Sequence, residues 1–426
     1  MRAISRDLRL DSAAASEVLV YCLGMGLRQH GDAPLARLSR ADWDPVLHCA
    51  SLHKVAALLH HRLRAAGSEV VPKDVTDWLR SETLARATTN LELTRQLCMV
   101  LVALRDEGIP VIVLKGAYLA HVIYENIALR TMVDIDLLVR NADLGRTESV
   151  LLAMGYGPRE RPSVQAQRVQ AHHLVRFSAP GLVPVEVHWT IEPLPAIFDI
   201  DIDSMWTRAQ PARVAGVEVS ALAPPDLLAH LALHAAYQHR FGVRLRHLCD
   251  VAETLRHFNP GFDWQALASL ATRYHIERFI AVTLSVTRAL LGIELPQSLP
   301  ASLRTRSEDA ALVSDIRQYV LTFPLDLPIV YREMRGTDSM TEKLRLLLRS
   351  FIPARDRLRA MYGLAPDSPA VYWYYLARPA DMLRRRRGSV WQMLRGTELF
   401  RSSVARQRTG MSIERWAQGE GPAKMQ

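Results

Sequence analysis

At about 150 residues per domain, a chain of 426 residues suggests two or three structural units. Its 49% hydrophobic and 23% charged residues exclude a disordered or collagen-like chain, and four scattered cysteines give no sign of a disulfide framework or a zinc motif. Lys and Arg outnumber Asp and Glu by 53 to 44, and the net charge of +9 favours phosphates or acidic partners only in a general way. No apolar run approaches the ~20 residues of a membrane span, and the N-terminus lacks the apolar core of a signal peptide. We therefore expect a cytoplasmic protein.

The predicted elements change character along the chain. Apolar side chains recur at helical spacing through residues 12–106. Residues 109–114 are a short β-branched run that ends at Lys115 and Gly116, which predicts a buried strand entering a turn. Beyond the turn the pattern predicts helices over residues 117–125 and 143–154, and strands over residues 133–139, 173–178 and 183–189. Helical spacing returns at Pro224 and continues to about residue 290.

This order predicts an α+β fold in which a small mixed-sheet core lies between helical segments. We divide the chain into a helical N-terminal region (residues 1–106), the core (107–220), a helical domain covering the cleft (221–300) and an Arg-rich helical region (301–426).

Acidic side chains on two of the predicted strands are spaced in a pattern that could bind a cation. Because side chains alternate along a strand, Asp134 and Asp136 project from one face, and Glu186 and His188 share a face of a later strand. If the two strands are neighbours, Glu186 becomes a third carboxylate beside the pair. Three carboxylates with Lys115 at the end of a preceding strand suit Mg²⁺ carrying a polyphosphate, as phosphoryl and nucleotidyl transfer require.

These features resemble the DNA polymerase beta-like nucleotidyltransferase superfamily, and more closely a bacterial family of uncharacterised nucleotidyltransferases. The resemblance rests on an ordered set of residues rather than on one motif. The set comprises Leu114, Lys115 and Gly116, Tyr124, Arg130, residues 134–139, Gly155 and Tyr156, residues 186–189, Asp226, His230, His234, Asp250, Trp264, Arg378 and Pro379.

The resemblance implies transfer of a nucleoside monophosphate from an NTP to an acceptor, with Mg²⁺ or Mn²⁺ and release of pyrophosphate. It implies that Asp134, Asp136 and Glu186 are catalytic and hold the metal, with Glu186 as a candidate base. It further implies nucleotide binding by Lys115, Gly116 and Arg130, and it leaves acceptor contact or a structural role open for His188, His234 and Asp250. The acceptor stays open among small molecules, sugars, peptides, protein side chains and RNA.

Several alternatives stay open from the residues alone. Gly116 is followed by Ala117 where most superfamily members have a second glycine or a serine, so the chain could be a non-catalytic nucleotide-binding or interaction protein. His230 and His234 are spaced to share a helix face and a metal, although packing explains them as well. Asp199, Asp201 and Asp203 repeat the acidic pattern without a glycine turn, and we interpret them as a solvated edge or loop. Arg384–Arg387 beside residues 372–375 would suit nucleic acid or a membrane surface, although a solvated helix end over an aromatic core strip explains them as well, so the sequence permits nucleic acid but does not favour it.

Overall fold

The computed structural model describes part of the chain in detail. The described residues are 12–24, 31, 33–67, 69–158, 174, 176–191, 198–242, 245–322, 373 and 409–418. The chain separates into two compact units, Met1–Leu321 and Thr322–Gln426, and every element discussed below belongs to the first unit. The basic and aromatic segment at residues 372–387 lies outside the described residues, apart from Trp373, which is exposed. No helix within the described ranges is both long enough and apolar enough to cross a membrane.

Helices make up most of the first unit. The α-helices are α1 (Ser12–Leu23), α3 (Arg40–Leu52), α4 (Ala56–Ala65), α5 (Lys73–Asp106), α6 (Lys115–Tyr118), α7 (Leu144–Ala153), α9 (Ile202–Arg208), α10 (Pro224–Leu233), α11 (Leu245–Phe258), α12 (Trp264–Arg273), α13 (Glu277–Leu291) and α14 (Ala310–Leu321). Short 3₁₀ turns are η1 (Leu35–Arg37), η3 (Asn141–Asp143), η5 (Ala301–Leu303) and η6 (Ser307–Asp309). Two segments wind as π-helix, η2 (Leu119–Ile123) and η4 (His234–Gln238).

A mixed seven-stranded sheet forms between the helical segments, with the order β3-β4-β5-β2-β1-β7-β6. Its strands are β1 (Ile112–Val113), β2 (Ile135–Leu138), β3 (Gly157–Pro158), β4 (Phe177–Ser178), β5 (Val185–His188), β6 (Gln210–Val214) and β7 (Val217–Ala221). Strand β2 runs antiparallel to β1 and parallel to β5, and β1 runs parallel to β7. The predicted α+β fold, with a small mixed sheet between helical regions, is confirmed.

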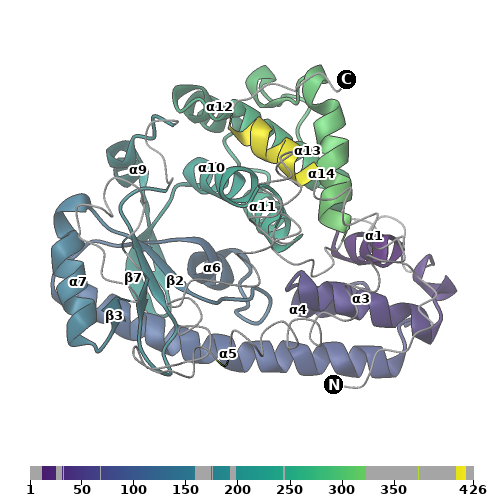
Figure 1. The fold of residues 1–426 in the computed structure, drawn as a ribbon, viewed down its shortest axis with the longest axis horizontal. Coiled ribbons are helices and arrows are strands. Elements are labelled where there is room, and N and C mark those ends of the chain that lie inside the picture. The colour runs from purple at the N-terminus through teal and green to yellow at the C-terminus, as the bar shows by residue number, and fades with distance from the viewer. Residues whose placement is uncertain are drawn as a thin grey trace. The chain divides into compact units, whose positions relative to one another are not determined.

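Helices cover the sheet on both sides, which explains why its central strands are largely buried. Helix α5 packs against β7 and α7, while α6 packs against β2 and η2 packs against α11. Figure 1 shows α7 and α6 on opposite sides of β2 and β7, with α5 running along the base of the unit. All four residues of β2 are buried as a result.

Two buried amide side chains on α5 fix the segments that carry the candidate site. Asn90 donates hydrogen bonds to the carbonyls of Ile127 and Arg130, the latter at 2.8 Å, in the segment that leads into β2. Gln96 donates to the carbonyl of Val183 at 2.6 Å and accepts from the same residue's backbone N–H at 2.9 Å, just before β5. Because unpaired polar groups are costly when buried, these contacts hold both strands in place.

The structure refines one sequence interpretation. Asp199 is an exposed loop residue, as expected, and Asp201 ends that loop by capping helix α9, where its carboxylate accepts the backbone N–H of Ser204 at 2.9 Å. Asp203 lies within the first turn of that helix. Acidic residues satisfy the free N–H groups at a helix start, which accounts for this acidic run without any metal.

Candidate active site

The register of two parallel strands brings the predicted acidic residues together. Asp136 on β2 pairs with Glu186 on β5, and Leu138 pairs with His188. The expectation that these strands are neighbours is therefore confirmed. Side chains at paired positions of adjacent strands lie on the same face, so the carboxylates of Asp136 and Glu186 meet.

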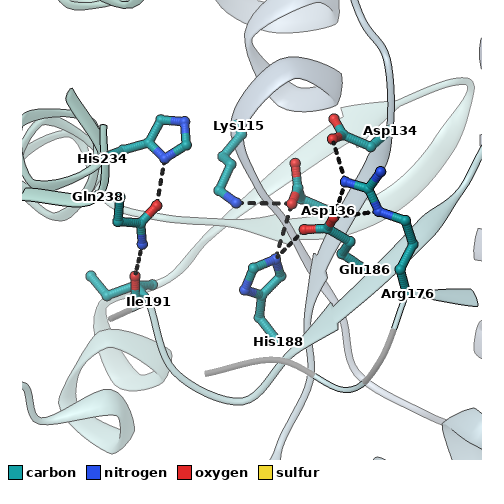
Figure 2. Close-up of polar contacts among 9 residues, drawn as sticks. All are labelled: Lys115, Asp134, Asp136, Arg176, Glu186, His188, Ile191, His234 and Gln238. Carbon is teal, nitrogen blue, oxygen red and sulfur yellow. Dashed lines mark hydrogen bonds and ion pairs between the residues drawn. The ribbon is translucent and has the colours of Figure 1, made fainter. Parts of the chain in front are cut away.

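Asp136 is the buried centre of the group. Its Oδ1 atom accepts a hydrogen bond from Lys115 Nζ at 2.9 Å and lies 2.9 Å from His188 Nε2 (Figure 2). His188 Nε2 also lies 3.8 Å from Glu186 Oε2. The side chains of Asp136 and His188 are almost completely buried, and that of Lys115 is only 11% exposed, so these charges interact with little screening by water.

Arg176, which the sequence did not indicate, joins the other two carboxylates. It precedes β4, and its Nε donates to Glu186 Oε1 at 2.8 Å while Nη2 contacts the same oxygen. The same guanidinium lies 3.6 Å from Asp134 Oδ2, as Figure 2 shows. Asp134 stands just before β2 and is half-buried.

The electrostatics separate the two aspartates. Although burial acts in the opposite direction, Lys115 and His188 hold the pKa of Asp136 well below its ordinary value. Burial, followed by the negative charges of Asp136 and Glu186, raises the pKa of Asp134 to about 6. The negative charges of Asp136, Glu186 and Asp134 raise the pKa of Lys115 despite its burial. The negative charges of Asp136 and Glu186 therefore disfavour ionisation of Asp134, and a bound cation would offset this repulsion.

The turn that carries Lys115 has an unusual backbone. Lys115 has φ of 45°, a left-handed conformation that costs side-chain-bearing residues about 1–2 kcal/mol. The next residue, Gly116, is buried, and a Cβ placed there would lie 3.2 Å from Arg130 Nη1. The predicted glycine turn is therefore packed directly on Arg130, and the strained backbone aims Lys115 at Asp136.

Arg130 and Asp250, two of the predicted residues, pair with each other rather than with the acidic group. Arg130 Nε and Nη2 donate to Asp250 Oδ1 and Oδ2 at 2.7 and 2.8 Å, and Tyr124 donates its hydroxyl to Oδ1 at 3.0 Å. Arg130 is 5% exposed and Asp250 is 1% exposed. Both side chains are thus committed to a buried ion pair, which is the structural role that stayed open for Asp250.

Two groups of side chains in the described part of the chain have donor atoms close enough to hold a metal ion. In one, ligand atoms of Asp136, Glu186 and His188 lie within 4.8 Å of one another, and Asp134 is linked to this group through Arg176. In the other, the same spacing joins His234 with two histidines absent from the sequence predictions, His239 and His247. Isolated histidines form no recognisable sequence motif, so His239 and His247 are identified only by their proximity to His234 in the structure.

The chain is similar to a protein family and to a solved structure. The profile of a family described as "Uncharacterised nucleotidyltransferase" matches residues 39–292, more than half of the chain. No curated protein matches. Among solved structures, the antibiotic-resistance factor ANT(2'')-Ia is similar at 12% identity over 43% of this chain and 94% of its own, with a TM-score of 0.32.

Proposed function

Because the chain belongs to the family of uncharacterised nucleotidyltransferases, we propose that it transfers a nucleoside monophosphate from an NTP to an acceptor and releases pyrophosphate. The observation that carries this proposal is the pairing of Asp136 with Glu186 on parallel strands, with Lys115 facing Asp136. Carboxylates that converge beside a buried ammonium suit a triphosphate with its divalent cation. The acceptor is a small molecule, a peptide or a sugar.

The residues present fit a divalent cation such as Mg²⁺ or Mn²⁺. Carboxylate oxygens are the ligands that these hard cations prefer, and Asp134, Asp136 and Glu186 would supply them. The raised pKa of Asp134, caused first by burial and then by the charges of Asp136 and Glu186, supports this fit because a cation would offset the crowded negative charge. When bound, the cation neutralises charge on the phosphates and orients the reacting oxygens.

The chain's own side chains have distinct roles in the proposed reaction. Lys115 provides positive charge for the phosphates, and the Gly116 turn positions it. An oxygen of the acceptor attacks the α-phosphorus, the bond from that phosphorus to the bridging oxygen breaks, and pyrophosphate leaves. Glu186, whose carboxylate lies beside Asp136, is the proposed base for the acceptor proton.

The test is calorimetric titration of the full chain with ATP, GTP, CTP and UTP, with and without Mg²⁺. Asp134→Asn is the main variant because Asp134 is only half-buried, whereas Asp136 is buried. Asp136→Asn is the second variant, and Asp199→Asn, at an exposed position, is the matched control. Thermal unfolding of each protein without ligand shows whether the fold is retained.

The proposal expects binding of at least one NTP that needs Mg²⁺, is weakened in Asp134→Asn and Asp136→Asn, and is unchanged in Asp199→Asn. Pyrophosphate release with a panel of sugars, peptides and small alcohols then identifies the acceptor. Metal-dependent binding without pyrophosphate release from any acceptor would support the second candidate, a non-catalytic nucleotide-binding protein, which the Gly116–Ala117 turn without a hydroxyl favours. Equal NTP binding by the wild type and Asp136→Asn would overturn the proposed site.

A further inference from the structure

A cluster of histidines lies beside the acidic group but is not part of it. The ring centroids of His234 and His239 are 4.4 Å apart, and those of His234 and His247 are 5.0 Å apart. His239 and His247 stack with centroids 4.7 Å apart and planes within 9°. Each of the three residues offers one ring nitrogen, and these three nitrogens lie within 4.8 Å of one another. We call His234, His239 and His247 the three-histidine cluster.

The backbone departs from regular helix where it builds this cluster. In an α-helix, residues five apart point about 140° away from each other. Here η4 winds as π-helix, and His239 donates its backbone N–H to the carbonyl of His234 at 3.1 Å, which aligns the two side chains. Single π-turns inside helices are frequent at functional sites.

The chain then reverses through two strained residues. Arg240 and Phe241 have φ of 49° and 54°, a left-handed conformation that costs side-chain-bearing residues about 1–2 kcal/mol each. The reversal leads into α11 and places His247 against His239. Backbone strain of this kind persists only where the surrounding structure enforces it. Here the strained reversal brings together three imidazoles from two elements.

A hydrogen bond sets the protonation of one of these rings. Gln238 Nε2 donates to the carbonyl of Ile191 at 3.2 Å, so its amide oxygen faces His234 (Figure 2). That oxygen lies 2.7 Å from His234 Nδ1, which must therefore donate. The proton is on Nδ1 and Nε2 keeps its lone pair. Metal-binding histidines have this arrangement, with the second ring nitrogen donating to a carbonyl or carboxylate.

We propose that His234, His239 and His247 bind a divalent transition-metal ion of the zinc class, with Gln238 as the residue that positions His234. Imidazole nitrogens select zinc and its neighbours over Mg²⁺, which prefers oxygen. Three protein ligands would leave a fourth coordination position open. His234 and His239 are only partly buried, so an ion can reach the cluster.

The charges around the cluster are compatible with an ion held by neutral rings. Burial, and to a smaller extent the positive charge of Lys115, lowers the pKa of His239 to about 4, and burial holds the pKa of His234 and His247 well below the ordinary value. Metal binding requires neutral imidazoles, and burial favours the neutral form of these rings. The charges of Lys115 and Arg246 both act on His239, and each group is paired, Lys115 with Asp136 and Arg246 with the carbonyl of Thr131, to which it donates at 3.1 Å.

This site is separate from the acidic group and does not depend on the proposed nucleotidyl transfer. Figure 2 shows Lys115 between His234 and Asp136, with His234 and Gln238 on the side away from Glu186 and Arg176. An ion in the three-histidine cluster would tie η4 to α11 next to Lys115. It would thereby hold these two elements together beside the acidic group.

The test uses Co²⁺ as a spectroscopic probe with the untagged full chain, followed by displacement with Zn²⁺. His239→Gln removes a ligand at a partly exposed position, and His48→Gln, at an exposed position in α3, is the matched control. Loss of an outer partner alone weakens metal binding by about 10–100-fold. We expect that range for Gln238→Leu and at least about 100-fold for His239→Gln, with no change for His48→Gln.

Asp136→Asn distinguishes the two candidate metal groups, because Co²⁺ could instead bind Asp136, Glu186 and His188. The proposal requires one equivalent of Co²⁺ with the ligand-field spectrum of nitrogen ligation, retained in Asp136→Asn and lost in His239→Gln. Unfolding midpoints of the metal-free variants show whether His239→Gln is folded. No Co²⁺ binding by the wild type, equal binding by folded His239→Gln, or loss in Asp136→Asn alone would overturn it.

Discussion

The guanidinium of Arg130 holds both carboxylate oxygens of Asp250, at 2.7 and 2.8 Å, across 120 positions of sequence. Arg130 precedes β2, and Asp250 lies in α11. The pair therefore joins the segment before β2, the strand that carries Asp136, to helix α11. Because Gly116 packs against the same guanidinium, one buried ion pair supports both the strand and the Lys115 turn.

Removal of one partner of this pair should strongly destabilise the protein. Asp250→Asn keeps the shape but leaves Arg130 buried without its counter-charge, and breaking a buried pair in this way typically costs about 3–5 kcal/mol. We expect a fall of that size in the free energy of unfolding, measured by urea titration. Arg130→Met with Asp250→Leu should cost less than the sum of the single variants, because neither charge is then left alone. An Asp250→Asn variant as stable as the wild type would show that the pair is not structural.

Lys115 combines a charge with a strained backbone, and two substitutions separate these contributions. Lys115→Ala and Lys115→Gly both remove the ammonium that faces Asp136. Glycine adopts φ near 45° without the penalty that alanine pays. We expect Lys115→Gly to be more stable than Lys115→Ala by about 1 kcal/mol in urea unfolding. Equal stability of the two variants would show that the turn relaxes to an ordinary conformation.

The sequence was informative where a short-range pattern determines structure. Period-two alternation around Asp136 and around Glu186 predicted which side chains share a face, and the paired register confirms it. The helical spacing on either side of the sheet likewise predicted the order of elements. Both patterns depend on neighbours a few residues away, which the sequence displays directly.

The features missed depend on long-range pairing or on special backbone geometry. Arg176 reaches Glu186 because β4 pairs with β5, and nothing within its own segment indicates that contact. The β6–β7 hairpin was also missed: its two-residue turn has φ of 51° at Ala215 and 80° at Gly216. Such turns usually begin with Asn or Asp, so alanine at the first position hides the signal. The three-histidine cluster needs a π-turn that no simple period describes.

His230 should limit stability in acid. It is fully buried, and neither ring nitrogen has a hydrogen-bond partner among the described residues. Burial, and then the charge of Lys115, lowers its pKa to about 3, against about 6.5 for an exposed histidine. The unfolded chain therefore binds more protons between these values, and stability is lost as pH falls from 6.5 toward 3.

His230→Leu tests this prediction because leucine has a similar volume and no polar atom. An unpaired buried polar group costs about 1–3 kcal/mol, so the variant should be at least as stable as the wild type at pH 7.5. Its advantage should grow by about 2 kcal/mol between pH 6.5 and pH 5, at 1.36 kcal/mol per pH unit. Urea midpoints at several pH values measure both effects. A variant that is less stable throughout, with a constant difference, would show that His230 has a favourable partner such as a buried water.

Asp134 should produce the opposite pH dependence when no divalent cation is present. Burial and the charges of Asp136 and Glu186 raise its pKa to about 6, so the folded state binds more protons than the unfolded state between about pH 4 and pH 6. Stability is then present below pH 4 and falls as pH rises through 6. Asp134→Asn cannot ionise, and its stability relative to the wild type should rise by about 1–3 kcal/mol between pH 4 and pH 7 in EDTA. Mg²⁺ at pH 7 should stabilise the wild type more than the variant, since a bound cation relieves the same charge. A stability difference that stays flat with pH in EDTA would mean that Asp134 ionises normally in the folded protein.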